Sequence, residues 1–254
     1  MQGIKTRARR ERRRSRALLA AAAVGVSALY AGYVHGRSLW VPLLQRVSGQ
    51  RSVADVVREV GPAARARLAP HFARAAVRYP PSKVVLLAFK KERRIELWAA
   101  SGTQRRFLRE YAVTAASGTT GPKRREGDQQ VPEGLYNVTW LHPNSSYHLS
   151  MKLNYPNATD RRHARAEGRT RLGGDIFIHG KAVSIGCLAV GDEAIEELFV
   201  LAADSGRNVD VVIAPADLRR GPLPEADLPA DVPWARELYQ QIENKLAAFR
   251  RPVS

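Results

Sequence analysis

The chain has 254 residues, 44% of them hydrophobic and 26% charged, which is enough for one good-sized globular domain with extensions. It contains one cysteine, Cys187, which excludes an intramolecular disulfide and a multi-cysteine metal site. The formal net charge of +17 is high, but the basic residues are scattered and their densest run adjoins an apolar segment. This arrangement favours a membrane or an anionic envelope polymer as partner and disfavours nucleic acid.

The first 34 residues have the pattern of a membrane segment. Residues 1–16 hold eight Lys or Arg and one Glu, and the 18 residues 17–34, ALLAAAAVGVSALYAGYV, hold no charge. As a helix this run would be about 27 Å long, close to the hydrocarbon thickness of a bilayer. No A-x-A cleavage site follows it, so we expect an uncleaved signal anchor in preference to a cleaved signal peptide. The preceding charge predicts a cytoplasmic N-terminus and a periplasmic body held at the inner membrane.

Residues 35–82 are predicted to form a helical connecting region. Ser52 is the expected N-cap of its first helix, with Asp55 as capping-box partner. Gly61-Pro62 should end that helix, and a second, Ala/Arg-rich helix, broken near Pro70, is expected over residues 63–77. The purpose of this connecting region is not evident from the sequence.

From Lys83 the pattern changes to short strands separated by turns. We expect strands at residues 84–89, 94–99, 107–116, 135–140, 148–153, 175–179 and 209–213. The first is a continuous apolar run, which predicts burial on both faces. Two long polar loops, residues 117–134 and 154–174, interrupt the strands, and loops of this length within a compact domain are usually functional or disordered.

Two helices are expected near the end of the chain. Residues 193–203 are amphipathic, and a terminal helix follows a Pro-rich linker. The terminal helix carries a stripe of Trp234, Leu238, Ile242, Leu246 and Phe249, which predicts a face packed on the body of the protein. A partner-binding or membrane-surface role for this stripe is the alternative.

The stretch GDIFIHGKAVSIGCLAVGD, residues 174–192, carries the strongest chemical signal. His179 should end a strand, and Cys187 should sit on the turn that follows, where loops present chemistry on a rigid frame. A histidine can take the proton of a thiol and so generate the nucleophilic thiolate. Gly186 allows a sharp turn that aims a backbone N–H at a reacting carbonyl, and Ser184 is a small polar group between the two. A buried structural cysteine beside an unrelated histidine is the alternative.

These residues resemble a known family, the L,D-transpeptidase catalytic domain, or YkuD family. HGKAVSIGC, residues 179–187, is similar to its His-Gly…Ser-x-Gly-Cys signature, and GPKRREGDQQVPEGLYNV, residues 121–138, to its Gly-Asp…Thr-Pro-Glu-Gly-x-Tyr segment. LNYPNATDR and GDEAIEELF resemble the YafK-like murein transpeptidase branch. The eight-residue step from histidine to cysteine, and Ile185 where a second histidine is common, depart from cross-linking members and fit that branch.

The resemblance implies the fold class. It predicts a mostly β, sandwich-like catalytic domain over residues 83–214. Together with the N-terminal membrane helix and the flanking helices expected from the residue patterns, this gives an α+β fold overall. Residues 215–254 would then be a linker and an amphipathic C-terminal helix.

The resemblance also implies the mechanism. Cys187 would attack a diamino-acid carbonyl in a peptidoglycan stem peptide, with His179 as proton acceptor and donor. Backbone N–H groups of Gly186 and Cys187 would hold the oxyanion, and Ser184 would orient His179. No cofactor is implied. His142, His148 and His163 are dispersed, so no metal site is expected.

Substrate contacts are expected at Asn154, Tyr155 and Asp160 on the loop before the catalytic strand, and at Gly180 beside His179. Turn chemistry explains the first three as well. Lys123, Arg124 and Arg125 could meet substrate carboxylates or form a merely solvated basic loop.

Three functions from different classes remain open at this point. The first is peptidoglycan acyl transfer in cell-wall biogenesis or remodelling. The second is a cysteine amidase that hydrolyses a stem-peptide amide or the link between an envelope protein and the wall. The third is a membrane-tethered wall-binding module without catalysis.

Overall fold

The computed structural model describes residues 24–25, 32–33, 36–37, 41, 49–101, 104–182, 184 and 186–251. The chain divides into two units, Met1–Gln50 and Arg51–Ser254, and the second is described below. The predicted basic region, residues 1–16, and most of the predicted anchor, residues 17–34, lie outside the described residues. Among the residues that are described, no helix has the length and apolar character needed to cross a bilayer.

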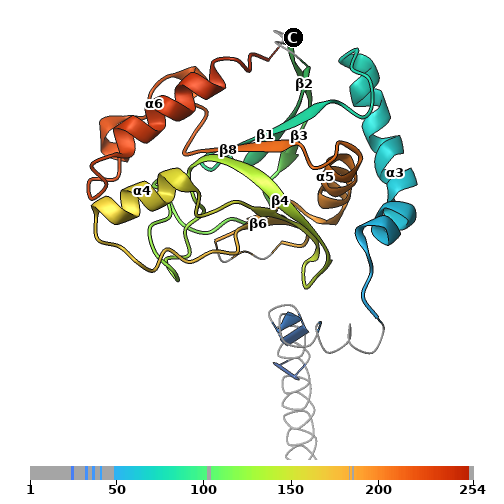
Figure 1. Cartoon of the computed structure of the whole chain (residues 1–254), viewed down its shortest axis with the longest axis horizontal. Helices are drawn as coiled ribbons and strands as arrows, with labels where there is room; N and C mark the ends of the chain where they lie inside the picture. Colours follow the sequence, from blue (N-terminus) through green and yellow to red (C-terminus); the bar gives the residue numbers. More distant parts are fainter. Residues whose placement is uncertain are drawn as a thin grey trace, which may run out of the picture. The chain divides into compact units, whose positions relative to one another are not determined.

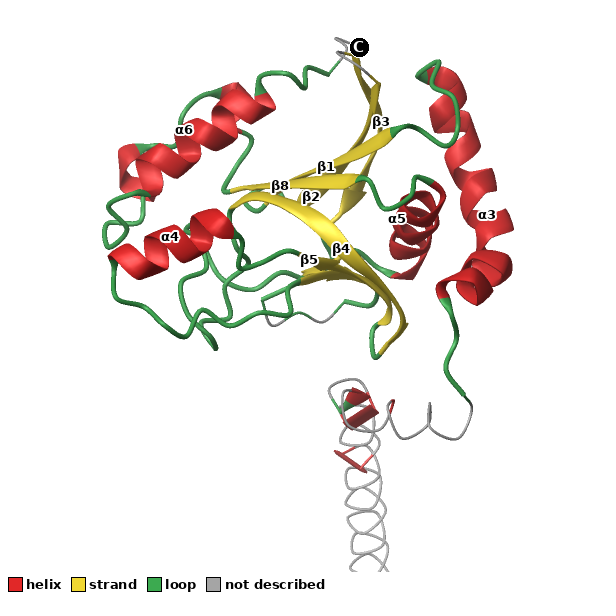
Figure 2. Cartoon of the chain, in the orientation of Figure 1, coloured by secondary structure: helices red, strands yellow, loops and turns green. Residues whose placement is uncertain are grey.

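The second unit is built on one mixed sheet with the strand order β3-β2-β1-β8-β4-β5-β6-β7 (Figures 1 and 2). The strands are β1 Lys83–Phe89, β2 Arg94–Ser101, β3 Gln104–Ala112, β4 Gly134–Ser145, β5 His148–Leu153, β6 Phe177–His179, β7 Leu188–Ala189 and β8 Val209–Ala214. All seven predicted strands are confirmed. The eighth, β7, has only two residues, too few for a period-2 pattern to be recognised.

Strand β4 joins the two halves of the sheet. Its first residues, 134–137, pair with β8, and from Val138 onward it pairs with β5 instead. The pairs β1–β8 and β6–β7 are parallel and the other neighbours are antiparallel. The parallel β6–β7 pair matters most for function, because it fixes where the cysteine lies relative to the histidine.

The helices are α3 Val53–Arg74, α4 Ala158–Ala166, α5 Asp192–Asp204 and α6 Ala235–Leu246, with short 3₁₀ turns η1 Leu218–Arg220 and η2 Glu225–Asp227. Helices α3 and α5 lie together on one side in Figure 1, away from α6. Within residues 83–214 strands predominate, and α3 and α6 flank them. This agrees with the predicted β-rich domain in an α+β chain.

Each face of the sheet has its own hydrophobic core. Val84, Leu86 and Ala88 of β1 face the core shared with α3 and α5. The alternate residues, Val85, Leu87 and Phe89, face the core under α6. The predicted burial of this strand on both faces is therefore confirmed, as is the packing of the terminal helix on the body of the protein.

The predicted break at Gly61-Pro62 is wrong, because α3 runs without interruption past Pro62 and also past Pro70. The capping box of Ser52 and Asp55 at its start is as predicted. A proline inside a helix costs about 3 kcal/mol, so other contacts must offset it. Leu68 and Phe72 are buried in the core beside α5, and Arg65 binds Asp204 at 2.8 Å.

The segment 154–174 is not wholly a loop as predicted, since it contains α4. Asn157 caps this helix by accepting hydrogen bonds from the N–H groups of Thr159 and Asp160, and Asp160 accepts in return from the Asn157 N–H at 2.8 Å. The low hydrophobicity of ATDRRHARA hides the helix from a periodicity search, whereas the capping pair was visible in the sequence.

Candidate active site

Cys187 and His179 lie on neighbouring strands. His179 is the last residue of β6, Cys187 directly precedes β7, and the two strands pair in parallel with His179 opposite Ala189 and Ile178 opposite Leu188. One register step back, Cys187 comes beside Phe177. Residues two apart in a strand point to the same face, so the thiol and the imidazole share one face of the sheet.

The imidazole of His179 is held in one tautomer. Its side chain is buried, with 3% of the residue exposed, and its Nδ1 lies 2.6 Å from the carbonyl oxygen of Gly180. A carbonyl can only accept, so Nδ1 carries the hydrogen and the neutral ring keeps Nε2 as a free base. Burial lowers the pKa of His179 below its ordinary 6.5, outweighing the carbonyl contact, so the ring is neutral at pH 7.

The thiol of Cys187 is protonated in this arrangement. Burial raises its pKa, and the Asp175 carboxylate adds to this, while the Phe177 N–H acts in the opposite sense. Its Sγ lies 3.8 Å from the carbonyl oxygen of Asp175. The thiol and the imidazole of His179 form no hydrogen bond with each other among the described contacts. The resting site therefore pairs a neutral thiol with a neutral base, both on the same face.

Two serine hydroxyls hold the cysteine turn. The Ser184 hydroxyl donates to the Cys187 carbonyl at 2.5 Å and accepts from the Cys187 N–H at 3.0 Å. Gly186, at φ +99°, donates its N–H to the hydroxyl of Ser117 at 2.6 Å. Ser184 thus acts on the main chain of Cys187 and not on His179, whose orienting partner is Gly180. Both N–H groups expected to hold an oxyanion are occupied by hydroxyls.

Residues 83–213 match the family model of the L,D-transpeptidase catalytic domain, YkuD, which is half of the chain. The chain belongs to this family. It is 40% identical over 120 residues to the putative L,D-transpeptidase YafK of Escherichia coli K12, and equally to that of strain O157:H7. The matched region is 46% of this chain and 46% of each relative, so it spans about half the length of either.

Solved structures give weaker similarities. The helical cell shape determining protein Pgp2 of Campylobacter jejuni matches with a TM-score of 0.44 and 23% identity, over 53% of this chain and 48% of that one. Bd1075 of Bdellovibrio bacteriovorus matches with a TM-score of 0.38 and 23% identity, over the same shares.

Three residues predicted to contact substrate have structural partners in the YkuD domain. The Oδ1 of Asn154 accepts from the Asn137 N–H of β4 at 2.9 Å. Tyr155 is 4% exposed, and its hydroxyl donates to the Leu172 carbonyl at 3.2 Å. Asp160 caps α4, and its burial raises the pKa of that carboxyl to about 6. These positions favour the turn-chemistry alternative.

Gly180 fills a tight space beside the histidine. A Cβ at this position would come within 2.7 Å of an Asp192 carboxylate oxygen and 2.8 Å of the Tyr147 carbonyl oxygen. Its role is therefore to let β6 turn closely past these groups while its own carbonyl orients His179.

The basic triplet of the first long loop is tied to carboxylates of the protein. Lys123 is 7% exposed and donates to Asp128 at 2.5 Å, and Arg124 binds Asp231 at 2.7 Å. Arg125 is exposed, with its backbone N–H on Asp128 at 3.0 Å. Of the three, only Arg125 presents its side chain outward.

Sequence reasoning missed Ser117 and Tyr147. The hydroxyl of Ser117 accepts from Gly186 and donates to the Gln129 carbonyl at 2.6 Å, so it joins the long loop to the cysteine turn. The ring of Tyr147 lies 4.8 Å from that of His179. Nothing in the local pattern around either residue indicates these contacts, which link positions far apart in the chain.

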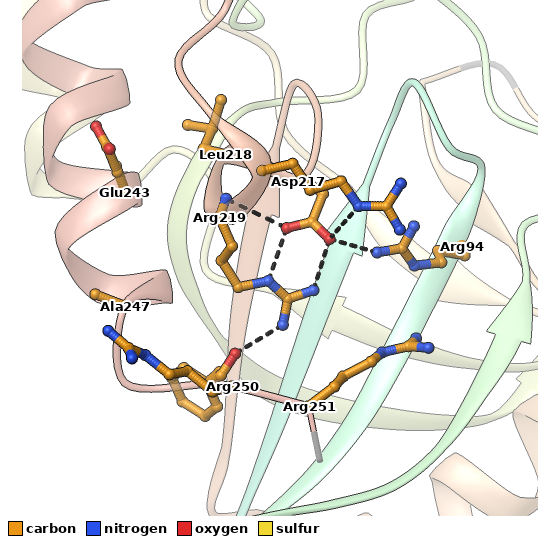
Figure 3. Close-up of a pocket in the computed structure, with 10 residues that line it drawn as sticks. Arg94, Asp217, Leu218, Arg219, Glu243, Ala247, Arg250 and Arg251 are labelled. Carbon is orange, nitrogen blue, oxygen red and sulfur yellow. Dashed lines mark hydrogen bonds and ion pairs between the residues drawn. The ribbon is translucent and has the colours of Figure 1, made fainter. Parts of the chain in front are cut away.

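A cavity of about 500 Å³ lies away from the thiol, beside α6. At this cavity lies an arginine cluster, which we define as Arg94, Glu96, Asp217, Arg219 and Arg251. Figure 3 shows its members Arg94, Asp217, Arg219 and Arg251. Its arginines bind the carboxylates of Glu96 and Asp217, both 5% exposed or less. In the part of the chain that the structure describes, no group of three or more His, Cys, Asp or Glu is placed to hold a metal ion.

Proposed function

We propose that this chain is a cysteine-dependent acyltransferase that acts on peptidoglycan stem peptides. The observation that carries the proposal is the placement of Cys187 and His179 on one face of the parallel β6–β7 pair of a YkuD domain, with Nε2 of His179 unprotonated. Membership of the L,D-transpeptidase family and the similarity to YafK support the acyl-transfer chemistry and the wall substrate.

The first half-reaction makes a thioester. Sγ of Cys187 attacks a backbone carbonyl of the stem, its proton passes to Nε2 of His179, and the tetrahedral intermediate collapses. The C–N bond then breaks, and His179 returns the proton to the leaving amine. Because the pKa of the thiol is raised and that of the histidine lowered, the proton moves during the attack and no ion pair exists beforehand.

The oxyanion would be held by the N–H groups of Cys187 and Gly186. These donors now bind Ser184 and Ser117, so the substrate oxygen has to take the place of a hydroxyl. Either exchange replaces one hydrogen bond with a stronger one to a charged acceptor. Substrate binding and rearrangement of the turn are therefore coupled in this proposal.

The test uses protein lacking residues 1–35, digested sacculi, and a Cys187→Ala variant. The fragment profile should change with the Cys187 protein and stay unchanged with the variant. Equal change with both proteins would overturn the catalytic proposal and leave a wall-binding module.

The second half-reaction separates transfer from hydrolysis. An amine that attacks the thioester gives a new amide, and water gives a free acid. With a labelled amino acid present, incorporation into the fragments identifies a transferase. Trimming without label identifies a hydrolase, which could also release a wall-linked envelope protein.

We also propose that residues 17–34 anchor the protein in the inner membrane with the YkuD domain on the periplasmic side. The charge of residues 1–16 and the length of the apolar run support this. The measurement is the N-terminus of the protein in the envelope fraction. A mature N-terminus beyond Val34 would contradict an anchor and indicate a cleaved signal.

A further inference from the structure

Three strands and the residue that precedes β7 place a row of side chains across the sheet, ending at the nucleophile. Trp140 of β4 pairs with Lys152 of β5, and Lys152 pairs with Phe177 of β6. One register step before the Ile178–Leu188 pair, Phe177 comes beside Cys187. Residues in register on neighbouring strands share a face, so these four side chains form one line that we call the cross-strand row.

Burial shows that the cross-strand row is on the outer face. Trp140 is 45% exposed and the side chain of Lys152 is 35% exposed, with Phe177 and Cys187 partly exposed. One strand neighbour of each is 1% exposed or less and belongs to the core: Leu141, Met151, Ile178 and Leu188. Thr139, which precedes Trp140 where the register of β4 shifts, is exposed. The sheet thus separates a dry inner face from an accessible outer face that holds the thiol.

Direct contacts tie the middle of the cross-strand row to the thiol. Asp175 places its carbonyl oxygen 3.8 Å from Sγ of Cys187, and its carboxylate lies 2.6 Å from Nζ of Lys152. That ammonium also lies 5.9 Å from the centre of the Phe177 ring. The carboxylate of Asp175 is 78% exposed, and an exposed ion pair of this kind is weak, so Lys152 is able to exchange it for another carboxylate.

The far end of the cross-strand row is an aromatic platform. The ring of Trp140 stacks on His142 with centroids 4.4 Å apart and planes at 19°. His142 covers one face of the indole and holds it in place, and the residue remains 45% exposed. A fixed, half-exposed indole presents a flat apolar surface with low conformational freedom, which suits the apolar face of a sugar ring.

We propose that the cross-strand row binds the junction of glycan and stem peptide, with a sugar ring on Trp140 and a stem carboxylate on Lys152. The inference rests on the proposed function, since it takes the stem as the substrate of Cys187. It goes further in assigning recognition of the glycan strand to this chain's own sheet, and it makes Trp140 and Lys152 determinants of specificity.

The dimensions of the substrate fit the row. Three inter-strand steps separate Cys187 from Trp140, about 14 Å in all. An extended peptide covers about 14 Å in roughly four residues, so the row has the length of a short peptide. A sugar that carries such a peptide reaches Trp140 when the attacked carbonyl is at Sγ. The free carboxylates along the stem pass Lys152 on the way.

Binding measurements on a catalytically inactive variant test the sugar contact at Trp140. Calorimetry on full-length Cys187→Ala protein would compare a disaccharide-linked tetrapeptide with the same peptide lacking sugar. The sugar-linked ligand should bind about fivefold to tenfold more tightly, and Trp140→Ala should remove that difference while leaving the bare peptide unaffected. Leu135→Ala is the matched control, because Leu135 is 39% exposed on the same strand and outside the row.

A second comparison tests the carboxylate contact. Lys152→Met should lower the affinity for both ligands by a similar factor. It should not change the affinity for a peptide whose carboxylates are amidated. Equal affinity for the two ligands, or an equal loss on both with Trp140→Ala, overturns the sugar assignment. Sugar-dependent binding without any Cys187-dependent turnover of wild-type protein would instead overturn the proposed function alone.

Discussion

The arginine cluster and the thiol site are both built from buried polar groups, but they are satisfied in different ways. Glu96 is fully buried and accepts hydrogen bonds from Arg219, Arg251 and Trp98, which lower its pKa against the effect of burial. At the thiol site, burial raises the pKa of Cys187 and lowers that of His179, and the two are not bonded to each other.

This difference in pairing indicates that the arginine cluster stabilises the fold and that the thiol site is the one suited to catalysis. A buried charge that is fully paired has no capacity left for a ligand, so it stabilises one arrangement of α6 on the sheet. Two neutral groups on one face, each bonded only to backbone, keep their reactive atoms free for a substrate. The cavity at the arginine cluster is therefore not the better candidate for catalysis (Figure 3). The predictions below separate activity from stability at the two sites.

The largest effect is expected from His179→Asn. Asparagine can keep an N–H donor toward the Gly180 carbonyl but supplies no base, so kcat should fall by about 10²- to 10⁴-fold. The unfolding free energy should change less than in the arginine-cluster variant described next. His148→Asn is the control, because His148 lies at φ +75°, which asparagine tolerates, and contacts Glu196. Equal losses in both variants would remove His179 from the mechanism.

At the arginine cluster we expect a large loss of stability and no loss of turnover. Glu96→Ala leaves Arg219 and Arg94 near the interior with one carboxylate fewer, which should lower the free energy of unfolding by about 3–5 kcal/mol. Urea denaturation measures this. Glu110→Ala removes a carboxylate that is 50% exposed and pairs with Arg94 and Arg251 of the same cluster, and it should cost about 1 kcal/mol or less.

Turnover per folded molecule should be unchanged in Glu96→Ala. If Glu96→Ala were stable but inactive, the arginine cluster would be needed for activity, and the distinction between a structural site and a catalytic site would be wrong.

The pH dependence of kcat/KM and of thiol alkylation tests whether Cys187 and His179 are both neutral in the free enzyme. His179 must be unprotonated to act, and its pKa lies below 6.5, so kcat/KM should persist at pH 6.5 and fall about tenfold per unit only at lower pH. The thiol pKa is raised above its ordinary 9.0, so the rate at which iodoacetamide alkylates the free enzyme should rise about tenfold per pH unit and level off only above pH 9. A plateau of fast alkylation between about pH 5 and pH 8 would reveal a thiolate–imidazolium ion pair and contradict the resting state described.

The smallest effect is expected at the cysteine turn. Ser184→Ala removes both hydrogen bonds to the main chain of Cys187, which should cost about 1–2 kcal/mol of stability and lower kcat by no more than about tenfold. The control is Ser205→Ala, because the hydroxyl of Ser205 is buried without a partner and its loss should be neutral. An unchanged kcat in Ser184→Ala would show that the turn holds its shape without this serine.

Local patterns predicted much of the fold because their causes are local. The apolar run of β1, the amphipathic α5 and the capping box of Ser52 each depend on residues within a few positions of one another. The continuity of α3 past Pro62 could not be read in the same way. It depends on α5, which is more than a hundred residues away.

The sequence by itself determined that one thiol and one histidine, eight residues apart on a strand and a turn, are the candidate chemical groups. The tertiary structure decided that they share a face, that serine hydroxyls occupy both N–H groups of the turn, and that Trp140 and Lys152 line up with the thiol. The physical reason is strand pairing. Register brings together residues from three strands and the turn before β7, and no local pattern in a chain records which residue of a distant strand will lie opposite.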